Sequence, residues 1–194
     1  GGFESAPDFG TRVRAEARRR GLGQAAKVVF IGDGAAWIGE LARVNFPTAL
    51  LILDLYHALE RLHQLCQGLY GVNGPWAARM EQTWTALLKA DQVAEVIAAA
   101  RRRLAQIGPQ PDDTLEKQIA YFEHHQDKML YQTYRAQGLF YGSGVVEGGC
   151  RSVIGQRLKE SGMFWTESGA TSVLTLRVAL KSHRSHLSKA SISS

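Results

Sequence analysis

The sequence predicts an α/β fold in which a crossover helix joins two parallel strands and most of the remaining chain is helical. Residues 26–31 (AKVVFI) and 49–53 (ALLIL) are short, nearly continuous apolar runs, which are typical of buried strands in a parallel sheet. Residues 35–44 between them have the pattern of a short helix that ends before Pro47. A strand, a helix and a second strand form a right-handed βαβ unit, so we expect the strands to run parallel.

Helical patterns fill the chain on both sides of this unit. A charged helix is expected from Asp8, as its N-cap, to Gly21, which favours its termination. After the second strand, apolar residues recur at helical spacing from Leu55 to Leu69, and residues 71–75 (GVNGP) break that helix. Further helices are expected over residues 75–89, 92–107, 115–137, 143–159 and 167–183.

This order of elements divides the chain into four regions. Residues 1–63 contain a helix, a strand, a helix and a strand, and residues 64–138 form an all-helical insertion. Residues 139–186 hold two C-terminal helices, and the Ser-rich tail from 187 to 194 is expected to fray.

The composition is that of a globular protein with a basic balance. The 194 residues are 45% hydrophobic and carry a formal net charge of +5, which is compatible with a nucleic-acid partner but does not select one. Cys66 and Cys150 are far apart and lack metal-site spacing, so neither a disulfide framework nor a zinc site is expected. Without an apolar run of membrane-spanning length or a signal-peptide pattern, we expect a cytoplasmic protein that does not act in a membrane.

Acidic residues follow both predicted strands. Asp33, between two glycines, ends the first strand, and Asp54 ends the second, with His57 three residues further on. Ligand sites in open parallel sheets lie outside the carboxyl ends of the strands, so this edge is a candidate site. Both aspartates also have structural alternatives, because Asp-Gly is common in turns and aspartate is a favoured helix N-cap.

A further acidic candidate, Glu147, lies in the glycine-rich stretch of residues 141–151 (YGSGVVEGGCR). Glycine is dense there at the start of a predicted helix, although it lowers helix stability, and it permits close approach of another backbone. Arg151 follows Glu147 by one helical turn. The structural alternative is a glycine-tolerant helix with a Glu–Arg pair that contributes a few tenths of a kcal/mol.

Basic residues interleaved with an aromatic residue follow Glu147. Cationic side chains bind phosphates and aromatic rings stack on bases, so this pattern favours DNA contact. For each residue taken singly, a solvated helix face or a core aromatic is the alternative. The DNA-binding candidates are Arg151, Arg157, Lys159, Trp165, Arg177 and Lys181.

One chemical hypothesis joins Asp33 and Glu147. Phosphodiester chemistry with two divalent metals requires carboxylates that converge from separate elements onto ions about 3.5–4 Å apart. Mg²⁺ prefers oxygen ligands and keeps several waters, so two or three carboxylates are sufficient. Asp33 at a sheet edge and Glu147 on a distant helix would supply two of them.

Three stretches of the chain carry a family resemblance: GDGAAWIGEL, FPTALLILDLYHALERL and YGSGVVEGGCRSVIGQRLKESGMFWTESGATSVLTLR. They resemble the bacterial insertion-sequence transposases of the Kra type, which are related to ISL-type and Mutator-like DDE transposases and have an RNase H-like catalytic domain. The resemblance implies that Asp33 is the second catalytic aspartate and Glu147 the catalytic glutamate, both of them metal ligands. It implies a supporting role near the active site for Asp54 and His57.

The resemblance also implies a truncated RNase H-like fold. Three strands would precede the first helix and carry the first catalytic aspartate, so residues 1–63 would be a partial core and we expect this chain alone to be inactive. The implied cofactor is Mg²⁺ or Mn²⁺, and the implied partners are transposon-end and target DNA, with a homo-oligomer in the active complex. A second hypothesis is a non-catalytic DNA-binding remnant or partner protein. A third hypothesis is a nucleotide-binding α/β protein. It requires a phosphate-binding glycine motif of the Walker or dinucleotide type, which this sequence does not contain.

Overall fold

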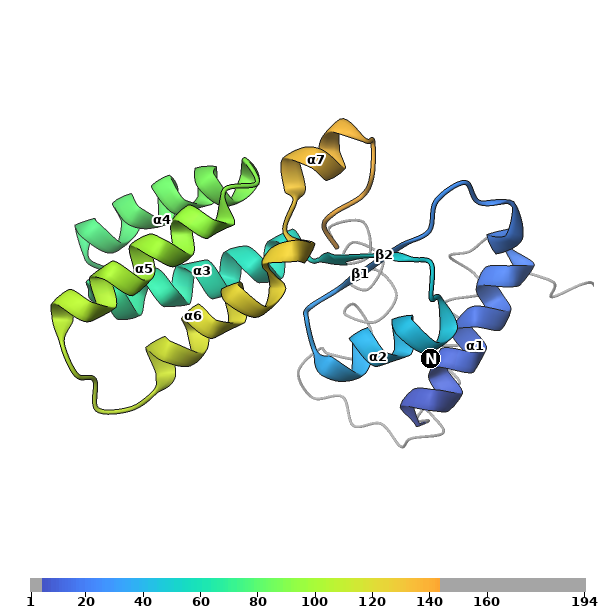
Figure 1. Ribbon diagram of the computed structural model, residues 1–194, viewed down its shortest axis with the longest axis horizontal. Coiled ribbons are helices and arrows are strands. Elements are labelled where there is room, and N and C mark those ends of the chain that lie inside the picture. Colours follow the sequence, from blue (N-terminus) through green and yellow to red (C-terminus); the bar gives the residue numbers. More distant parts are fainter. Residues whose placement is uncertain (1–4, 144–194) are drawn as a thin grey trace, which may run out of the picture. The chain divides into compact units, whose positions relative to one another are not determined.

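The structure is a computed structural model that describes residues 5–143 (Figure 1). Helices dominate these residues, and the strands form one small sheet, so the chain is of the α/β class. Within the described range, no helix combines the length and the apolar character needed to cross a membrane. In chain order the elements are α1 (Ala6–Arg19), the 3₁₀ helix η1 (Leu22–Gln24), β1 (Val29–Gly32), α2 (Ala36–Asn45), β2 (Leu50–Leu53), α3 (Leu55–Tyr70), α4 (Pro75–Lys89), α5 (Val93–Ile107), α6 (Thr114–His125), the 3₁₀ helix η2 (Gln126–Lys128) and α7 (Tyr131–Ala136).

The two strands pair in parallel and α2 connects them, which confirms the predicted βαβ unit. The register places Val29 opposite Leu50 and Gly32 opposite Leu53. β1 starts three residues later than its apolar run, and all four of its residues are only partly buried, so the expectation of a buried first strand is not met in the described residues. Ile52 and Leu53 of β2 are buried, so the second strand contributes directly to the core.

Helix α1 packs against α2 (Figure 1). Gly10 permits this approach, because a Cβ atom at that position would lie 2.5 Å from Nδ2 of Asn45. The expected N-cap at Asp8 is wrong: α1 begins at Ala6, so Asp8 lies in its first turn. Gly21 has a left-handed backbone with φ of 91°, and it follows the helix end where the sequence predicts a stop.

After the sheet, the long helices α3, α4, α5 and α6 lie side by side (Figure 1). α3 packs against α4 and α6, and α5 packs against the same two helices. Their buried faces join β2 and α7 in one continuous core, in which Trp84 and Phe122 are the largest fully buried side chains. α3 runs through residues 63 and 64, so one helix belongs both to the strand region and to the helical insertion.

The single helix expected over residues 115–137 is wrong, because α6, η2 and α7 divide this segment. The sequence between α6 and α7 has no glycine or proline, and the break has a tertiary cause. Met129 is fully buried at this point. Asp91, in the turn between α4 and α5, accepts hydrogen bonds from the first amides of α7, at Gln132 (2.7 Å) and Thr133 (3.0 Å). This carboxylate therefore caps α7 from a distant part of the chain.

Candidate functional site

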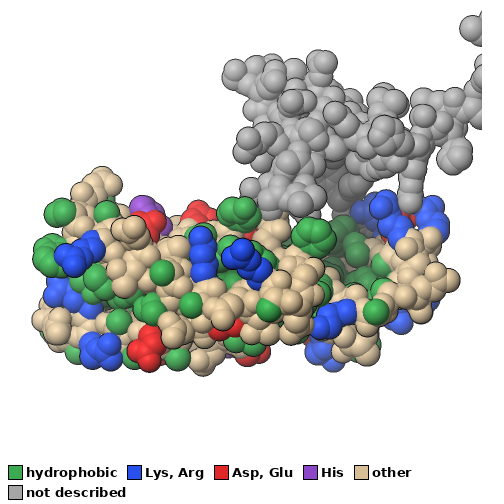
Figure 2. Space-filling view, turned by 90° about the horizontal axis from the view of Figure 1, so that it is seen from above, with side chains coloured by type: hydrophobic (Ala, Val, Ile, Leu, Met, Phe, Trp, Pro, Cys, Tyr) green, Lys and Arg blue, Asp and Glu red, His purple; other side chains and the backbone are tan. Residues whose placement is uncertain are grey.

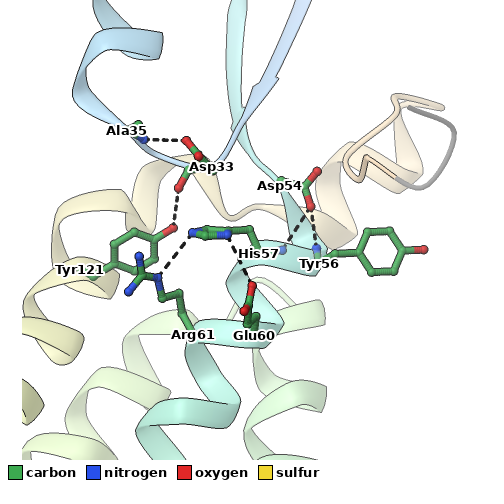
Figure 3. Close-up of polar contacts among 8 residues, drawn as sticks. All are labelled: Asp33, Ala35, Asp54, Tyr56, His57, Glu60, Arg61 and Tyr121. Carbon is green, nitrogen blue, oxygen red and sulfur yellow. Dashed lines mark hydrogen bonds and ion pairs between the residues drawn. The ribbon is translucent and has the colours of Figure 1, made fainter. Parts of the chain in front are cut away.

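The carboxyl ends of β1 and β2 lie side by side, and an aspartate follows each strand (Figure 3). Gly32 and Leu53 are partners in the ladder, and the backbone N–H of Asp54 donates to the carbonyl of Gly32 at 2.8 Å. Asp33 and Asp54 thus leave the sheet at the same edge from neighbouring strands. This is the edge at which open parallel sheets bind ligands.

Asp33 presents its carboxylate to solvent in a tight turn. Its Oδ1 accepts a hydrogen bond from the backbone N–H of Ala35 at 2.9 Å, and Gly34 between them has φ of +87°. Such an Asp turn is common after a strand, so the structural alternative for Asp33 is realised in the fold. The turn also holds an exposed carboxylate in a defined orientation at the sheet edge.

Asp54 is buried and caps α3. Its Oδ1 accepts hydrogen bonds from the backbone N–H groups of Tyr56 at 2.8 Å and His57 at 3.2 Å (Figure 3). The residue is 5% exposed, which distinguishes it from the exposed Asp33. The N-cap alternative is thereby confirmed for Asp54.

The imidazole of His57 lies below the two strand ends, among residues of α3 and α6 (Figure 3). Arg61 Nε donates to its Nε2 at 3.4 Å, and its Nδ1 lies 3.8 Å from Oε2 of Glu60. The ring also meets Tyr121 edge-on, with 6.2 Å between ring centroids. It is the backbone amide of His57, and not its ring, that bonds the Asp54 carboxylate.

Tyr121 is a site residue that the sequence does not reveal. It belongs to α6, and its hydroxyl donates to the backbone carbonyl of Asp33 at 3.0 Å. The pKa of Tyr121 is raised to about 12, mainly by burial; Arg61 opposes this rise, while Asp33 and Asp54 contribute to it. The phenol therefore remains a hydrogen-bond donor across the neutral pH range.

A second tyrosine makes the equivalent contact on β2. Tyr131 donates from its buried hydroxyl to the carbonyl of Leu53 at 3.0 Å. Burial raises the pKa of Tyr131 well above its ordinary value, so this hydroxyl also stays protonated. The last carbonyl of β2 and the first carbonyl after β1 thus each accept a hydrogen bond from a helical tyrosine.

A cavity of about 280 Å³ lies next to this edge, against the sheet and α2. His125 lines it, is 7% exposed, and has a pKa lowered to about 4, mainly by burial. The described lining has no carboxylate, which separates the cavity chemically from the aspartates. Its lining includes Gly34, Ala35, Ile38, His124, His125 and Lys128.

The other predicted site residues lie outside the described residues: Glu147, Arg151, Arg157, Lys159, Trp165, Arg177 and Lys181. Over residues 5–143, no group of three or more His, Cys, Asp or Glu side chains is arranged to hold a metal ion. The described part of the site therefore places Asp33 and Asp54 at the same sheet edge, with His57 beneath the strand ends, while each carboxylate bonds a backbone amide of its own segment (Figure 3).

Basic side chains outside the predicted set lie on α1. Figure 2 shows Lys and Arg side chains distributed over one face, including the end of the molecule that holds α1. Glu16 pairs with Arg19 and, at 2.6 Å, with Arg20, so part of this charge is neutralised locally. The arginines of α1 and the residue after it are Arg12, Arg14, Arg18, Arg19 and Arg20.

No family model, curated protein or solved structure matches this chain. The chemistry available at the carboxyl edge of the sheet is therefore inferred from the residues found there. These are an exposed carboxylate after β1, a buried capping carboxylate after β2, and two tyrosine hydroxyls on the adjacent carbonyls.

Proposed function

We propose that this chain is the C-terminal catalytic portion of a DDE DNA transposase, which cleaves DNA and transfers strands at transposon ends with Mg²⁺ or Mn²⁺. The observation that carries the proposal is the position of Asp33. Its exposed carboxylate follows a parallel strand directly and lies at the same sheet edge as Asp54. Metal-dependent phosphodiester chemistry requires such a carboxylate on a rigid element.

Asp33 fits a role as a metal ligand. One carboxylate oxygen of Asp33 accepts a hydrogen bond from the backbone N–H of Ala35, which orients the carboxylate. The side chain remains open to solvent. Mg²⁺ prefers oxygen ligands of this kind. The bound ions would activate the attacking oxygen and stabilise the leaving oxygen. In the proposal, Glu147 supplies another ligand, and Asp54 with His57 supports the edge instead of binding metal.

The proposed fold is RNase H-like, with β1 and β2 as its fourth and fifth strands. The order strand, helix, strand and the parallel pairing support this assignment. In the described residues β1 pairs with β2 alone, so its other edge has backbone groups available to a further strand. The family resemblance implies three more strands that carry another catalytic aspartate, and in the proposal they pair along this edge. The whole protein would act in the cytoplasm as a homo-oligomer on DNA.

The test is a cleavage assay on the protein extended with the residues encoded upstream, using plasmid DNA that carries the sequences flanking its gene. We expect cleavage with Mg²⁺ or Mn²⁺ and none with EDTA. Asp33→Ala and Glu147→Ala should reduce cleavage to background, whereas Glu95→Ala, which removes an exposed carboxylate from α5, should not. Full activity of either the Asp33 or the Glu147 variant would remove that residue from the active site.

The alternative is a non-catalytic DNA-binding remnant or partner derived from a transposase, which the arginine-rich α1 favours. It predicts DNA binding that weakens steeply with added salt and needs no divalent metal. The same upstream-extended protein decides between the two functions. Binding without cleavage would support the remnant, and metal-dependent cleavage would exclude it.

A further inference from the structure

Tyr121 connects the helical insertion to the Asp33 turn. Its hydroxyl donates to the Asp33 carbonyl at 3.0 Å, while the Asp33 carboxylate accepts the Ala35 amide at 2.9 Å (Figure 3). Hydrogen bonds therefore hold both the backbone carbonyl and the carboxylate of Asp33. Gly34, which follows, has left-handed φ and lacks a side chain that would limit its backbone. The Tyr121 bond restrains this turn from outside it.

The Tyr121 ring is itself fixed from two helices. The guanidinium of Arg61, on α3, lies over the ring at 5.2 Å from its centroid. His125, one turn further along α6, packs against the ring with 4.7 Å between centroids. The side chain is partly buried, so its hydroxyl is presented to the Asp33 carbonyl by a rigid arrangement. Groups with locked side chains are those that orient metal ligands effectively.

We propose that Tyr121 is a positioning residue for the Asp33 carboxylate, through which the helical insertion controls divalent-metal binding at the edge of the sheet. This inference rests on the proposed function of Asp33 as a metal ligand. It assigns the insertion a direct task at the site, because a hydroxyl on α6 bonds the backbone of a turn 88 positions earlier in the chain.

The first test measures the turn without any metal or DNA. Hydrogen exchange of the Ala35 amide, which bonds the Asp33 carboxylate, reports how firmly the turn is held. In the full chain, Tyr121→Phe should speed this exchange severalfold and leave the exchange of the β2 amides unchanged. Tyr134→Phe is the matched control, because the Tyr134 hydroxyl is buried with no partner among the described residues. Equal exchange at Ala35 in the wild type and Tyr121→Phe would overturn the proposal.

The second test measures metal binding in the upstream-extended protein by titration with Mn²⁺ followed by electron paramagnetic resonance. Tyr121→Phe should raise the half-saturating Mn²⁺ concentration about tenfold, the lower end of the effect of groups that orient metal ligands. Excess Mn²⁺ should then restore cleavage. A variant that is less stable but has wild-type Mn²⁺ dependence would show a merely structural role and overturn the proposal.

The two proposals fail in different ways. If Asp33→Ala leaves Mn²⁺ binding unchanged, the proposed function of Asp33 is wrong. If Asp33→Ala abolishes binding and Tyr121→Phe has no effect on binding or exchange, the function stands and only the role of Tyr121 is wrong.

Discussion

Gly34 packs so closely against His125 that no side chain fits between them. A Cβ atom on Gly34 would lie 2.9 Å from Nε2 of His125 and 3.0 Å from Cδ1 of Leu53. Gly34 also has φ of +87°, a backbone conformation that other residues adopt at a cost. The turn that carries Asp33 is therefore built around a glycine for both steric and conformational reasons.

Replacement of Gly34 by alanine should destabilise the protein. We expect Gly34→Ala to lower the free energy of unfolding by roughly 1–3 kcal/mol, measured by urea denaturation, because the backbone is strained and His125 must move. Gly39→Ala is the control: Gly39 lies inside α2, and an added Cβ would meet nothing within 4 Å beyond its chain neighbours and the backbone of its own helix. That change should stabilise by roughly 0.5–1 kcal/mol. The same loss at both positions would contradict the steric explanation.

His125 should make stability depend on pH below neutrality. Burial, with the positive charges of Lys128 and His124, lowers its pKa from 6.5 to about 4. The folded state thus keeps His125 neutral where the unfolded chain binds a proton, so its contribution is complete above pH 6.5 and is lost as the pH falls toward 4. We expect a loss of roughly 1–3 kcal/mol over this range, measured by urea unfolding at successive pH values.

The matched variants for this pH dependence are His125→Gln and His63→Gln. His125→Gln removes the buried titrating group, so its stability should fall less between pH 6.5 and 4. His63 is half exposed and pairs with Glu81 at 2.8 Å, so His63→Gln should not reduce the loss of stability between pH 6.5 and 4. An unchanged slope in His125→Gln would mean that another group causes the effect.

The sheet could be predicted from local sequence, but the division of the last helical segment could not. Apolar runs of strand length bounded by turn residues sufficed to place β1 and β2 and their parallel connection. The break between α6 and α7 depends on Met129 entering the core and on Asp91 capping α7 from 41 positions away. Neither cause is visible in the residues of the break itself.

The candidate site could likewise be predicted only where it depends on local sequence. Asp33 and Asp54 could be placed at one edge because each follows a strand, and the capping role of Asp54 follows from its residue type. The contacts of Tyr121 and Tyr131 could not be predicted, because their hydrogen-bond partners are 88 and 78 positions away in the sequence. Helical periodicity identifies a buried face but not which hydroxyl on it reaches a strand carbonyl.

Arg101 should stabilise the packing of α5 against α6. It donates to both oxygens of Glu123 at 2.9 Å and also pairs with Glu116. Because all three side chains are substantially exposed, Arg101→Gln should reduce the free energy of unfolding by about 1 kcal/mol or less at low salt. Arg102→Gln, on the exposed face, is the control and should change it less. Equal losses would exclude a specific contribution from the pair.

The Arg101 contribution should also disappear in acid. Hydrogen bonds from Arg101 hold the pKa of Glu123 below its ordinary value of 4.5. A lowered carboxyl pKa gives stability that is present above the unfolded pKa and lost as the pH falls through the folded one. The stability difference between the wild type and Arg101→Gln should therefore shrink below pH 4.5. A difference that stays constant into strong acid would contradict the ion pair as its source.

Two substitutions at Asp54 should distinguish a helix-capping role of this residue from a metal-binding role. Asp54→Ala removes the acceptor of the Tyr56 and His57 amides and should lower the free energy of unfolding by about 1–2 kcal/mol. Asp54→Asn keeps an acceptor oxygen, so chemical denaturation should show stability close to that of the wild type. If Asp54 only supports the edge, Asp54→Asn should also keep the Mn²⁺ half-saturation of the upstream-extended protein. Loss of Mn²⁺ binding in this folded variant would instead make Asp54 a ligand beside Asp33.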